Sequence, residues 1–125
     1  MKKNNKKGFT LAELLIVVAI IAVLVLIAIP VFTASLNKSK GATDEANARS
    51  LYAALTAEYL ADGTYTAPTG TVTAGTAFTL KDKDGNEYAF SDQVTALTIS
   101  VAADNKAPTV TIKSSGVDKT FGTTN

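Results

Sequence analysis

Acidic side chains are the main groups through which this chain could do chemistry, because its 125 residues include no histidine and no cysteine. Without histidine, the chain lacks the commonest general base and the commonest metal ligand. Without cysteine, it has no thiol nucleophile, no disulfide and no thiolate metal site. We therefore expect a protein that is not an enzyme and that uses no cofactor.

One carboxylate, Glu13, lies directly before a long apolar segment, where a charged group is unexpected. It is the only ionisable side chain in residues 8–37, and the sixteen residues from Leu14 to Ile29 are all apolar. A carboxylate within such a helix costs about 2–4 kcal/mol on membrane-insertion scales, so a function and a partner are expected for it. No lysine or arginine lies between Lys7 and Lys38, which leaves an N-terminal amine as the candidate cation.

A second group of oxygen ligands consists of Asp82, Asp84, Asn86 and Glu87. Carboxylate and amide oxygens are the ligands that calcium prefers, so these residues form a weak candidate calcium site. Their spacing lacks the full EF-hand pattern and its bidentate terminal glutamate. The favoured interpretation is a plain hairpin turn without metal, because Asp-Gly and Gly-Asn pairs are typical of such turns.

A membrane-spanning helix is the first element that must position these groups. Residues 9–32 are apolar except for a few positions, and they exceed the roughly 20 residues that cross a bilayer. Four lysines lie in residues 1–8, whereas Lys38 and Lys40 follow the apolar segment. The positive-inside rule therefore places the N-terminus in the cytoplasm and the C-terminal part outside.

Two alternatives to a membrane helix are less favoured. A chain of this size is too small to enclose such a helix as a buried core helix. A secretory signal peptide usually has a shorter apolar segment, and its cleavage site here would be the weak candidate Thr33-Ala34-Ser35. Beyond the leader the chain carries eleven acidic and eight basic residues, so no nucleic-acid surface is expected.

A specific motif, Gly8-Phe9-Thr10-Leu11-x-Glu13, joins the basic leader to the apolar segment. With these flanks, residues 6–32 resemble the type IV pilin family. The resemblance implies that a prepilin peptidase cuts between Gly8 and Phe9 on the cytoplasmic side and N-methylates the new Phe9 amine. The absence of cysteine favours a Gram-positive (clostridial-type) major pilin, because many Gram-negative pilins carry a disulfide.

This resemblance suggests roles for two residues of the helix. We expect Glu13 to pair with the Phe9 amine of an adjacent copy and so to set the register of assembly. The alternatives are that Glu13 extends to the lipid headgroups or caps the first helical turn. Pro30 predicts a kink or a locally melted turn, because proline removes a backbone donor; the alternative is that the helix ends at Ile29.

The remaining sequence predicts an α+β fold, a long N-terminal helix packed on a small antiparallel sheet. Strands are expected at 77–81, 87–90, 96–102 and 109–113, with an edge strand at 116–121, in one sheet of three to five strands. Gly41 reads as a flexible point or a surface glycine. The stripe expected to be buried consists of Ala48, Leu51, Tyr52, Leu55 and Tyr59, and the remaining, polar positions of this helix include Asp44, Glu45, Arg49 and Glu58. The predicted segments are a cleaved leader at 1–8, a hydrophobic helix at 9–37, an amphipathic helix at 38–61, a loop at 62–75 and a β head at 76–125.

The function that follows is a structural one. The resemblance implies a membrane-anchored precursor that polymerises through its apolar helix into an extracellular filament. Its expected partners are copies of itself, the prepilin peptidase, an assembly ATPase, a platform protein and, before assembly, the membrane. The alternatives are a secretion pseudopilin, a competence or minor pilin that binds DNA or a surface ligand, and an anchored protein that never assembles.

Overall fold

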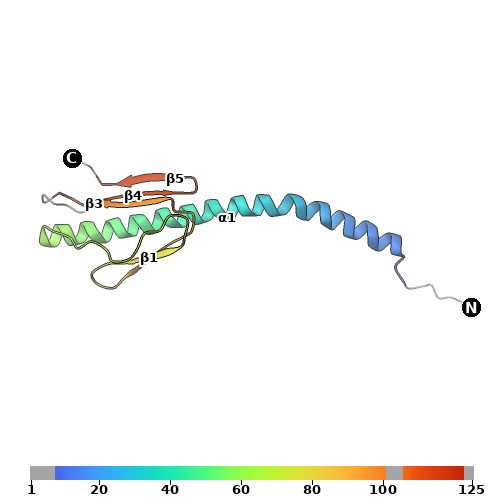
Figure 1. Ribbon diagram of the computed structural model, residues 1–125, viewed down its shortest axis with the longest axis horizontal. Coiled ribbons are helices and arrows are strands. Elements are labelled where there is room, and N and C mark those ends of the chain that lie inside the picture. The colour runs from blue at the N-terminus through green and yellow to red at the C-terminus, as the bar shows by residue number, and fades with distance from the viewer. Residues whose placement is uncertain (1–7, 101–105, 123–125) are drawn as a thin grey trace, which may run out of the picture. The chain divides into compact units, whose positions relative to one another are not determined.

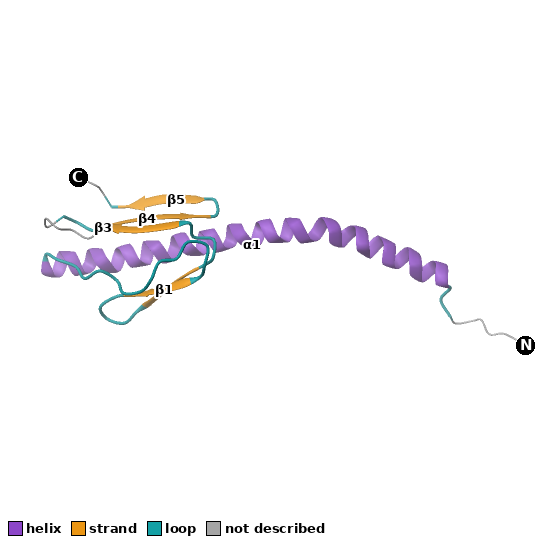
Figure 2. Ribbon diagram, in the orientation of Figure 1, coloured by secondary structure: helices purple, strands orange, loops and turns teal. Residues whose placement is uncertain are grey.

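The computed structural model describes residues 8–100 and 106–122, which form one helix followed by five strands (Figure 1). The elements are α1 (Leu11–Asp62), β1 (Phe78–Lys81), β2 (Glu87–Phe90), β3 (Ala96–Ser100), β4 (Thr109–Ser114) and β5 (Val117–Phe121). This order confirms the α+β class (Figure 2). The leader lysines and the residues predicted to extend the third strand beyond Ser100 lie outside the described residues.

The chain divides into two compact units, residues 1–35 and residues 36–125, and α1 contributes to both. In the first unit, every described residue is exposed, and the helix continues without interruption through Pro30. The alternative that the helix ends at Ile29 is therefore wrong. The expected local melting is not seen in this helix, and the kink at Pro30 stays a prediction.

In the second unit, α1 presents one buried stripe to the strands. The stripe consists of Gly41, Asp44, Ala48, Leu51 and Leu55, whose spacings of three and four follow the helical period. The predictions for Ala48, Leu51 and Leu55 are confirmed. Two further predicted members, Tyr52 and Tyr59, are half-buried. The helix ends where Gly63, with a φ of 74°, adopts the left-handed conformation that commonly closes helices.

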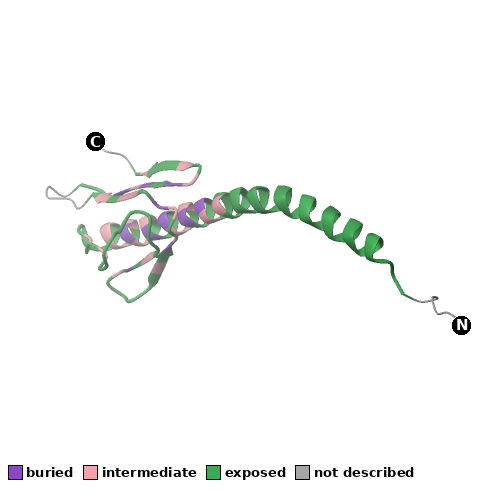
Figure 3. Ribbon diagram, turned by 45° about the vertical axis from the view of Figure 1, so that its right-hand side comes forward, coloured by how far each residue is buried: buried purple, intermediate pink, exposed green. Residues whose placement is uncertain are grey.

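The strands form two antiparallel sheets, which corrects the expectation of one sheet. One sheet pairs β1 with β2, and the other has the order β3-β4-β5. In Figures 1 and 3 the two sheets lie on different sides of the head part of α1. Both predicted hairpins are confirmed by their registers, with Leu80 opposite Tyr88 and Thr98 opposite Thr111.

The sheets stay separate because other groups bind the edges that would have to join. The side-chain amide of Asn47 donates to the Ala89 carbonyl of β2 at 2.6 Å. Next to β3, the amide of Gly75 donates to the Val94 carbonyl, and the hydroxyl of Tyr65 donates to the Ser100 carbonyl. Helix α1 and the loop before β1 thus supply donors to backbone carbonyls that pairing between β2 and β3 would otherwise use.

The hydrophobic core lies between α1 and the two sheets. Its buried members all belong to residues 36–125, as Figure 3 shows for the described chain. They are Ala48, Leu51, Leu55, Leu80, Phe90, Val94, Val110 and Ile112. Phe78 stacks on Phe90 with ring centroids 5.2 Å apart, which extends the core across the two-stranded sheet.

Candidate processing and assembly site

The first turn of α1 holds the predicted assembly residue in a capping box. The Thr10 amide donates to Glu13 Oε2 at 2.9 Å, and the Glu13 amide donates to Thr10 Oγ1 at 3.2 Å. This reciprocal pair satisfies two backbone donors that a helix start leaves open, and the carboxylate lies at the positive end of the helix dipole. In the single chain, Glu13 thus makes the first-turn cap that the sequence allowed as an alternative.

The predicted cleavage position precedes this cap. Residues 8–10 are not helical, and both Gly8 and Phe9 are exposed. A Cβ atom added at Gly8 would meet none of the described atoms within 4 Å, so there is open space on that side of the backbone. Because the capping box starts the helix at Leu11, the Gly8–Phe9 bond stays in non-helical backbone.

The apolar surface that follows is continuous. Large apolar side chains between Phe9 and Phe32 expose 43–81% of their surface. The helix contains an 18-residue window with a mean hydropathy of 3.5, none of it buried, and is long and apolar enough to cross a membrane. Such a surface is too large to remain in contact with water, so lipid or protein has to cover it.

Asp44 is a residue that the helical pattern places among the polar positions of the amphipathic helix. That placement is wrong, because Asp44 is 1% exposed. Its carboxylate accepts hydrogen bonds from the Ser91 amide at 2.8 Å, the Ser91 hydroxyl at 2.6 Å and the Ser114 hydroxyl at 2.7 Å. The signal was present in the spacing, since Asp44 precedes the buried Ala48 by four residues on the same helical face.

Gly41 is likewise not a surface glycine, because it is buried on the same stripe. A Cβ atom at this position would overlap the carbonyl oxygen of Ser115, in the turn between β4 and β5. Glycine is therefore required by close approach of two backbones. The residue types alone could not reveal this contact, because it depends on how the turn packs on the helix.

The candidate calcium ligands form a hydrogen-bonded turn. Asp82 Oδ1 accepts from the amides of Asp84 and Asn86 at 2.9 Å each, and Oδ2 accepts from Asn86 Nδ2 and the Tyr88 hydroxyl. Glu87 instead pairs with Lys81 at 2.9 Å. Among the described residues, no group of three or more acidic, histidine or cysteine side chains is placed to hold a metal ion.

Two pKa values at this turn are shifted in opposite directions, with that of Asp82 lowered and that of Tyr88 raised. The hydrogen bonds from Asn86, Tyr88 and Asp84 lower the pKa of Asp82, although partial desolvation opposes them. Desolvation, followed by the bond to Asp82, raises the pKa of Tyr88. Groups of the same hairpin thus stabilise the charged form of the Asp82 carboxylate.

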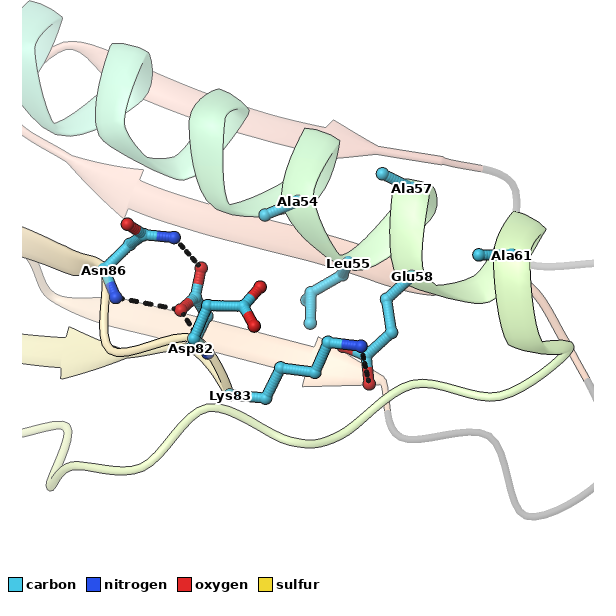
Figure 4. Close-up of a pocket in the computed structure, with 9 residues that line it drawn as sticks. Ala54, Leu55, Ala57, Glu58, Ala61, Asp82, Lys83 and Asn86 are labelled. Carbon is cyan, nitrogen blue, oxygen red and sulfur yellow. Dashed lines mark hydrogen bonds and ion pairs between the residues drawn. The ribbon is translucent and has the colours of Figure 1, made fainter.

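A pocket of about 310 Å³ lies between this turn and the last turns of α1 (Figure 4). Lys83 reaches across it towards Glu58 and Asp62, with Nζ 3.6 Å from an oxygen of each. Desolvation opposes the charge of Lys83, but Glu58 and Asp62 outweigh it, so the pKa of Lys83 is raised. The pocket is lined by small alanines, Leu55 and Glu58 of α1 and by polar residues of the turn, and the Lys83 ion pairs join the hairpin to the helix.

Most lysines of the head are paired with carboxylates. Lys113 lies 3.8 Å from Asp118, and Lys119 lies 3.8 Å from Glu45, whereas Lys81 and Lys83 have the partners given above. Apart from Glu58 and Glu45, whose side chains are 10% and 24% exposed, the paired groups are largely exposed, and such pairs individually contribute little stability. Their positions distribute the positive charge over the head.

Comparison with known proteins agrees with the N-terminal motif. Residues 3–29 match the family described as the prokaryotic N-terminal methylation motif. The fimbrial protein EcpC of Eikenella corrodens is 34% identical over 120 residues, which cover 95% of this chain and 71% of that protein. A fimbrial protein of Dichelobacter nodosus is 37% identical over 90 residues, which cover 72% of this chain and 54% of that protein.

A third relative matches most of both chains. The major component PilA5 of the type IV narrow pilus of Thermus thermophilus is 34% identical over 113 residues, or 85% of this chain and 95% of that protein. No solved structure matches the chain. The comparisons do not favour the pseudopilin or competence-pilin alternatives. With its methylation motif, its long apolar helix and its small antiparallel head, the chain belongs to the type IV pilin family of structural pilus subunits.

Proposed function

We propose that this pilin is made as a precursor from which residues 1–8 are removed, and that the Phe9 amine is then methylated. The methylation motif that spans residues 3–29 supports this proposal. The exposed, non-helical backbone at Gly8 and Phe9 also supports it, because proteases act on extended segments that they can enclose. The enzyme responsible would be a prepilin peptidase on the cytoplasmic side of the membrane.

Before assembly, the apolar helix would anchor the subunit in the membrane with its N-terminus in the cytoplasm. The excess of lysines before the helix supports this orientation through the positive-inside rule. The head, residues 36–125, would then face the outside. An assembly ATPase and a platform protein would extract the subunit, and the filament would cover the apolar surface that lipid covered before.

Glu13 would then have two roles, one in the membrane and one in the filament. In the membrane, its capping box with Thr10 reduces the cost of placing a carboxylate beside an apolar segment, because each partner satisfies the other. In the filament, the carboxylate would pair with the cationic Phe9 amine of a neighbouring copy. The observation that carries this proposal is that Glu13 is the only ionisable side chain in residues 8–37.

The proposal is tested by Glu13→Gln and Glu13→Ala in the native host, with Thr10→Ser as a matched control. Glutamine retains the capping geometry but not the charge, whereas serine at position 10 retains a capping hydroxyl. We expect both Glu13 variants to be cleaved after Gly8 yet to give at least tenfold fewer sheared fibres. Normal fibre yield from Glu13→Gln would contradict charge pairing.

Mass spectrometry of sheared fibres tests the processing step separately. We expect an N-terminal peptide that begins at Phe9 and carries one added methyl group. A chain that begins at Met1 and stays in the membrane fraction would contradict both cleavage and assembly. A chain that begins near Ser35 would show that a secretory signal had been removed instead.

A further inference from the structure

We propose that Asp84, at the tip of the β1–β2 hairpin, is a site of spontaneous covalent modification that converts it to isoaspartate. Only water takes part in the reaction besides the chain itself. The site lies in the head, so the inference goes beyond the proposed processing and assembly and does not depend on either. Because the reaction needs only time, the modified fraction would increase with the age of the protein.

The reaction joins an aspartate side chain to the backbone amide that follows it. The nitrogen of Gly85 attacks Cγ of the protonated Asp84 carboxyl group, an N–Cγ bond forms, and the amide hydrogen and the carboxyl hydroxyl leave together as water. Water then opens the resulting five-membered succinimide. Where it breaks the bond from the nitrogen to the backbone carbonyl carbon, the chain afterwards runs through Cβ and Cγ, which is isoaspartate. Where it breaks the N–Cγ bond, aspartate is restored.

The sequence limits this chemistry to two favourable positions. Of the seven aspartates in the chain, Asp62 and Asp84 are the two that precede a glycine. Glycine has no Cβ atom, so no side chain crowds the attacking nitrogen and the backbone can rotate into the cyclic geometry. The other aspartates precede larger residues, and a glutamate would have to close a larger ring. The tertiary structure distinguishes between the two positions.

At Asp62 the reacting groups are held apart by the end of the helix. Asp62 is the last residue of α1, and the Gly63 amide donates to the Tyr59 carbonyl at 2.8 Å. The nitrogen that would attack is therefore bound in the closing turn, and it cannot approach the side chain unless that turn opens. The ion pair with Lys83 Nζ, at 3.6 Å, also restrains the carboxylate.

At Asp84 these restraints are missing. Asp84 is exposed, and within the described part of the chain its carboxylate accepts no hydrogen bond and forms no ion pair. Gly85 has a φ of 85°, and a Cβ atom placed there would meet none of the described atoms within 4 Å. Its amide donates to the Asp82 carbonyl at 3.1 Å. The attack thus has to break one bond of a hairpin turn, whereas at Asp62 it has to open a helix end.

The product would change the turn that holds the hairpin against the helix. Isoaspartate adds one atom to the backbone between the amides of Asp84 and Asn86. Asp82 Oδ1 accepts from both amides at 2.9 Å, and the two bonds cannot both keep their geometry when the backbone between the donors lengthens. Lys83, in the same turn, reaches Glu58 of α1 (Figure 4). We therefore expect the modified turn to bind Asp82 and the helix less well.

Timed incubation of the full chain in detergent micelles tests the assignment. Mildly acidic buffer supplies protonated carboxyl groups, and the peptides are compared by liquid chromatography and mass spectrometry with synthetic standards that contain isoaspartate. We expect at least tenfold more isoaspartate at position 84 than at position 62. A parallel sample unfolded in guanidinium chloride should form it at similar rates at both positions, because the helix end has melted. Equal conversion at the two positions of the folded chain would overturn the proposal.

Matched variants confine the reaction to the tip. Asp84→Asn should react faster than the parent chain, with loss of ammonia in place of water, whereas Asp84→Glu should give no rearranged product at this position. Asp62→Glu should leave the conversion of Asp84 unchanged. If Asp84→Asn stays intact in the folded chain but reacts when unfolded, the turn blocks the attack and the proposal is wrong.

The effect on the turn has its own measurement. In an aged sample of the parent chain, the Asn86 amide should exchange its hydrogen faster than in an equally aged Asp84→Glu sample, while the amides of β4 should exchange equally in both. Faster exchange confined to the hairpin would support the predicted loss of the Asp82 bonds. Equal exchange of the Asn86 amide in the two samples, with isoaspartate present in the first, would contradict it.

Discussion

Two carboxylates in apolar surroundings, Glu13 and Asp44, are stabilised by different means. Glu13 lies at a helix start, where its own first turn supplies a backbone donor. Asp44 lies within the head, where two serines from distant parts of the chain supply its donors. The first arrangement is local and follows from the Thr10-x-x-Glu13 spacing. The second requires the folded head.

Thr56 is a polar residue that the head leaves unsatisfied. Among the buried side-chain nitrogen and oxygen atoms of the described residues, Thr56 Oγ1 is the one without a hydrogen-bond partner. Thr56→Val should therefore raise the free energy of unfolding by about 1 kcal/mol, since an unsatisfied buried hydroxyl is removed at nearly constant volume. Urea unfolding of the full chain in mild detergent, followed by circular dichroism, measures the change.

Thr43→Val provides the control for this change. Thr43 is exposed, and its hydroxyl bonds the Ser39 carbonyl within the helix. A substitution at such a site should change stability by less than about 0.5 kcal/mol. A loss of stability in Thr56→Val would show that the hydroxyl has a partner, such as a bound water molecule.

Asp82 gives the hairpin a pH dependence. Its pKa in the folded protein lies below the ordinary value of 3.8, because the turn stabilises the carboxylate. The stabilisation is therefore present above pH 3.8 and is lost as the pH falls through the lower folded pKa. An NMR titration of the Asn86 amide should show a midpoint below 3.8, and Asp82→Asn should abolish it. A midpoint at or above the ordinary value would contradict the hydrogen-bonded turn.

At the scale of elements, α1 changes its role along its length while it keeps one secondary structure. Its first part is apolar on all sides, which is typical of a helix covered by lipid or by other helices. Its last part has a single buried stripe for the sheets. Helix–sheet packing, rather than propensity, decides which residues of this second part are buried.

Gly41→Ala tests the close approach between α1 and the β4–β5 turn. At an exposed helical site, this change would stabilise the protein by about 1 kcal/mol. Here the added methyl group would overlap the Ser115 carbonyl, so a loss of at least about 1 kcal/mol is expected. Thermal unfolding measures the sign directly. Ala42→Ser, at the neighbouring exposed position, should change little, and a gain in Gly41→Ala would refute the contact.

At the scale of the whole molecule, the two units differ in whether their apolar side chains are buried within the subunit. The buried apolar residues of the described chain lie within residues 36–125, whereas most large exposed apolar residues lie before Leu36. The head thus contains its own core, and the helix before it requires a membrane or a filament. This division fits a subunit that passes from one apolar environment to another with its head folded.

Truncation tests this division. A fragment of residues 36–125 should fold and stay monomeric in water, because it retains the whole core and loses the membrane segment. Analytical ultracentrifugation and a cooperative thermal transition would establish both properties. The full chain without detergent should associate under the same conditions. An unfolded or aggregated fragment would show that the head depends on the preceding helix.

The sequence by itself determined the elements whose causes are local. Sixteen apolar residues in succession predict the membrane helix, Gly8-Phe9-Thr10-Leu11-x-Glu13 indicates the family, and turn residues with alternating apolar positions predict the hairpins. Period and turn chemistry act between near neighbours, so they can be read along the chain. The positions of β2, β4 and β5 follow these predictions to within about one residue at each end.

The tertiary structure alone decided the contacts between distant segments. It divided the strands into two sheets, because Asn47 and the loop before β1 bind the edges that would have joined. It buried Asp44 beside Ser91 and Ser114, and it required a glycine at position 41. These partners are 19–74 residues apart in the chain, and no local pattern encodes a pairing that exists only after the head has folded.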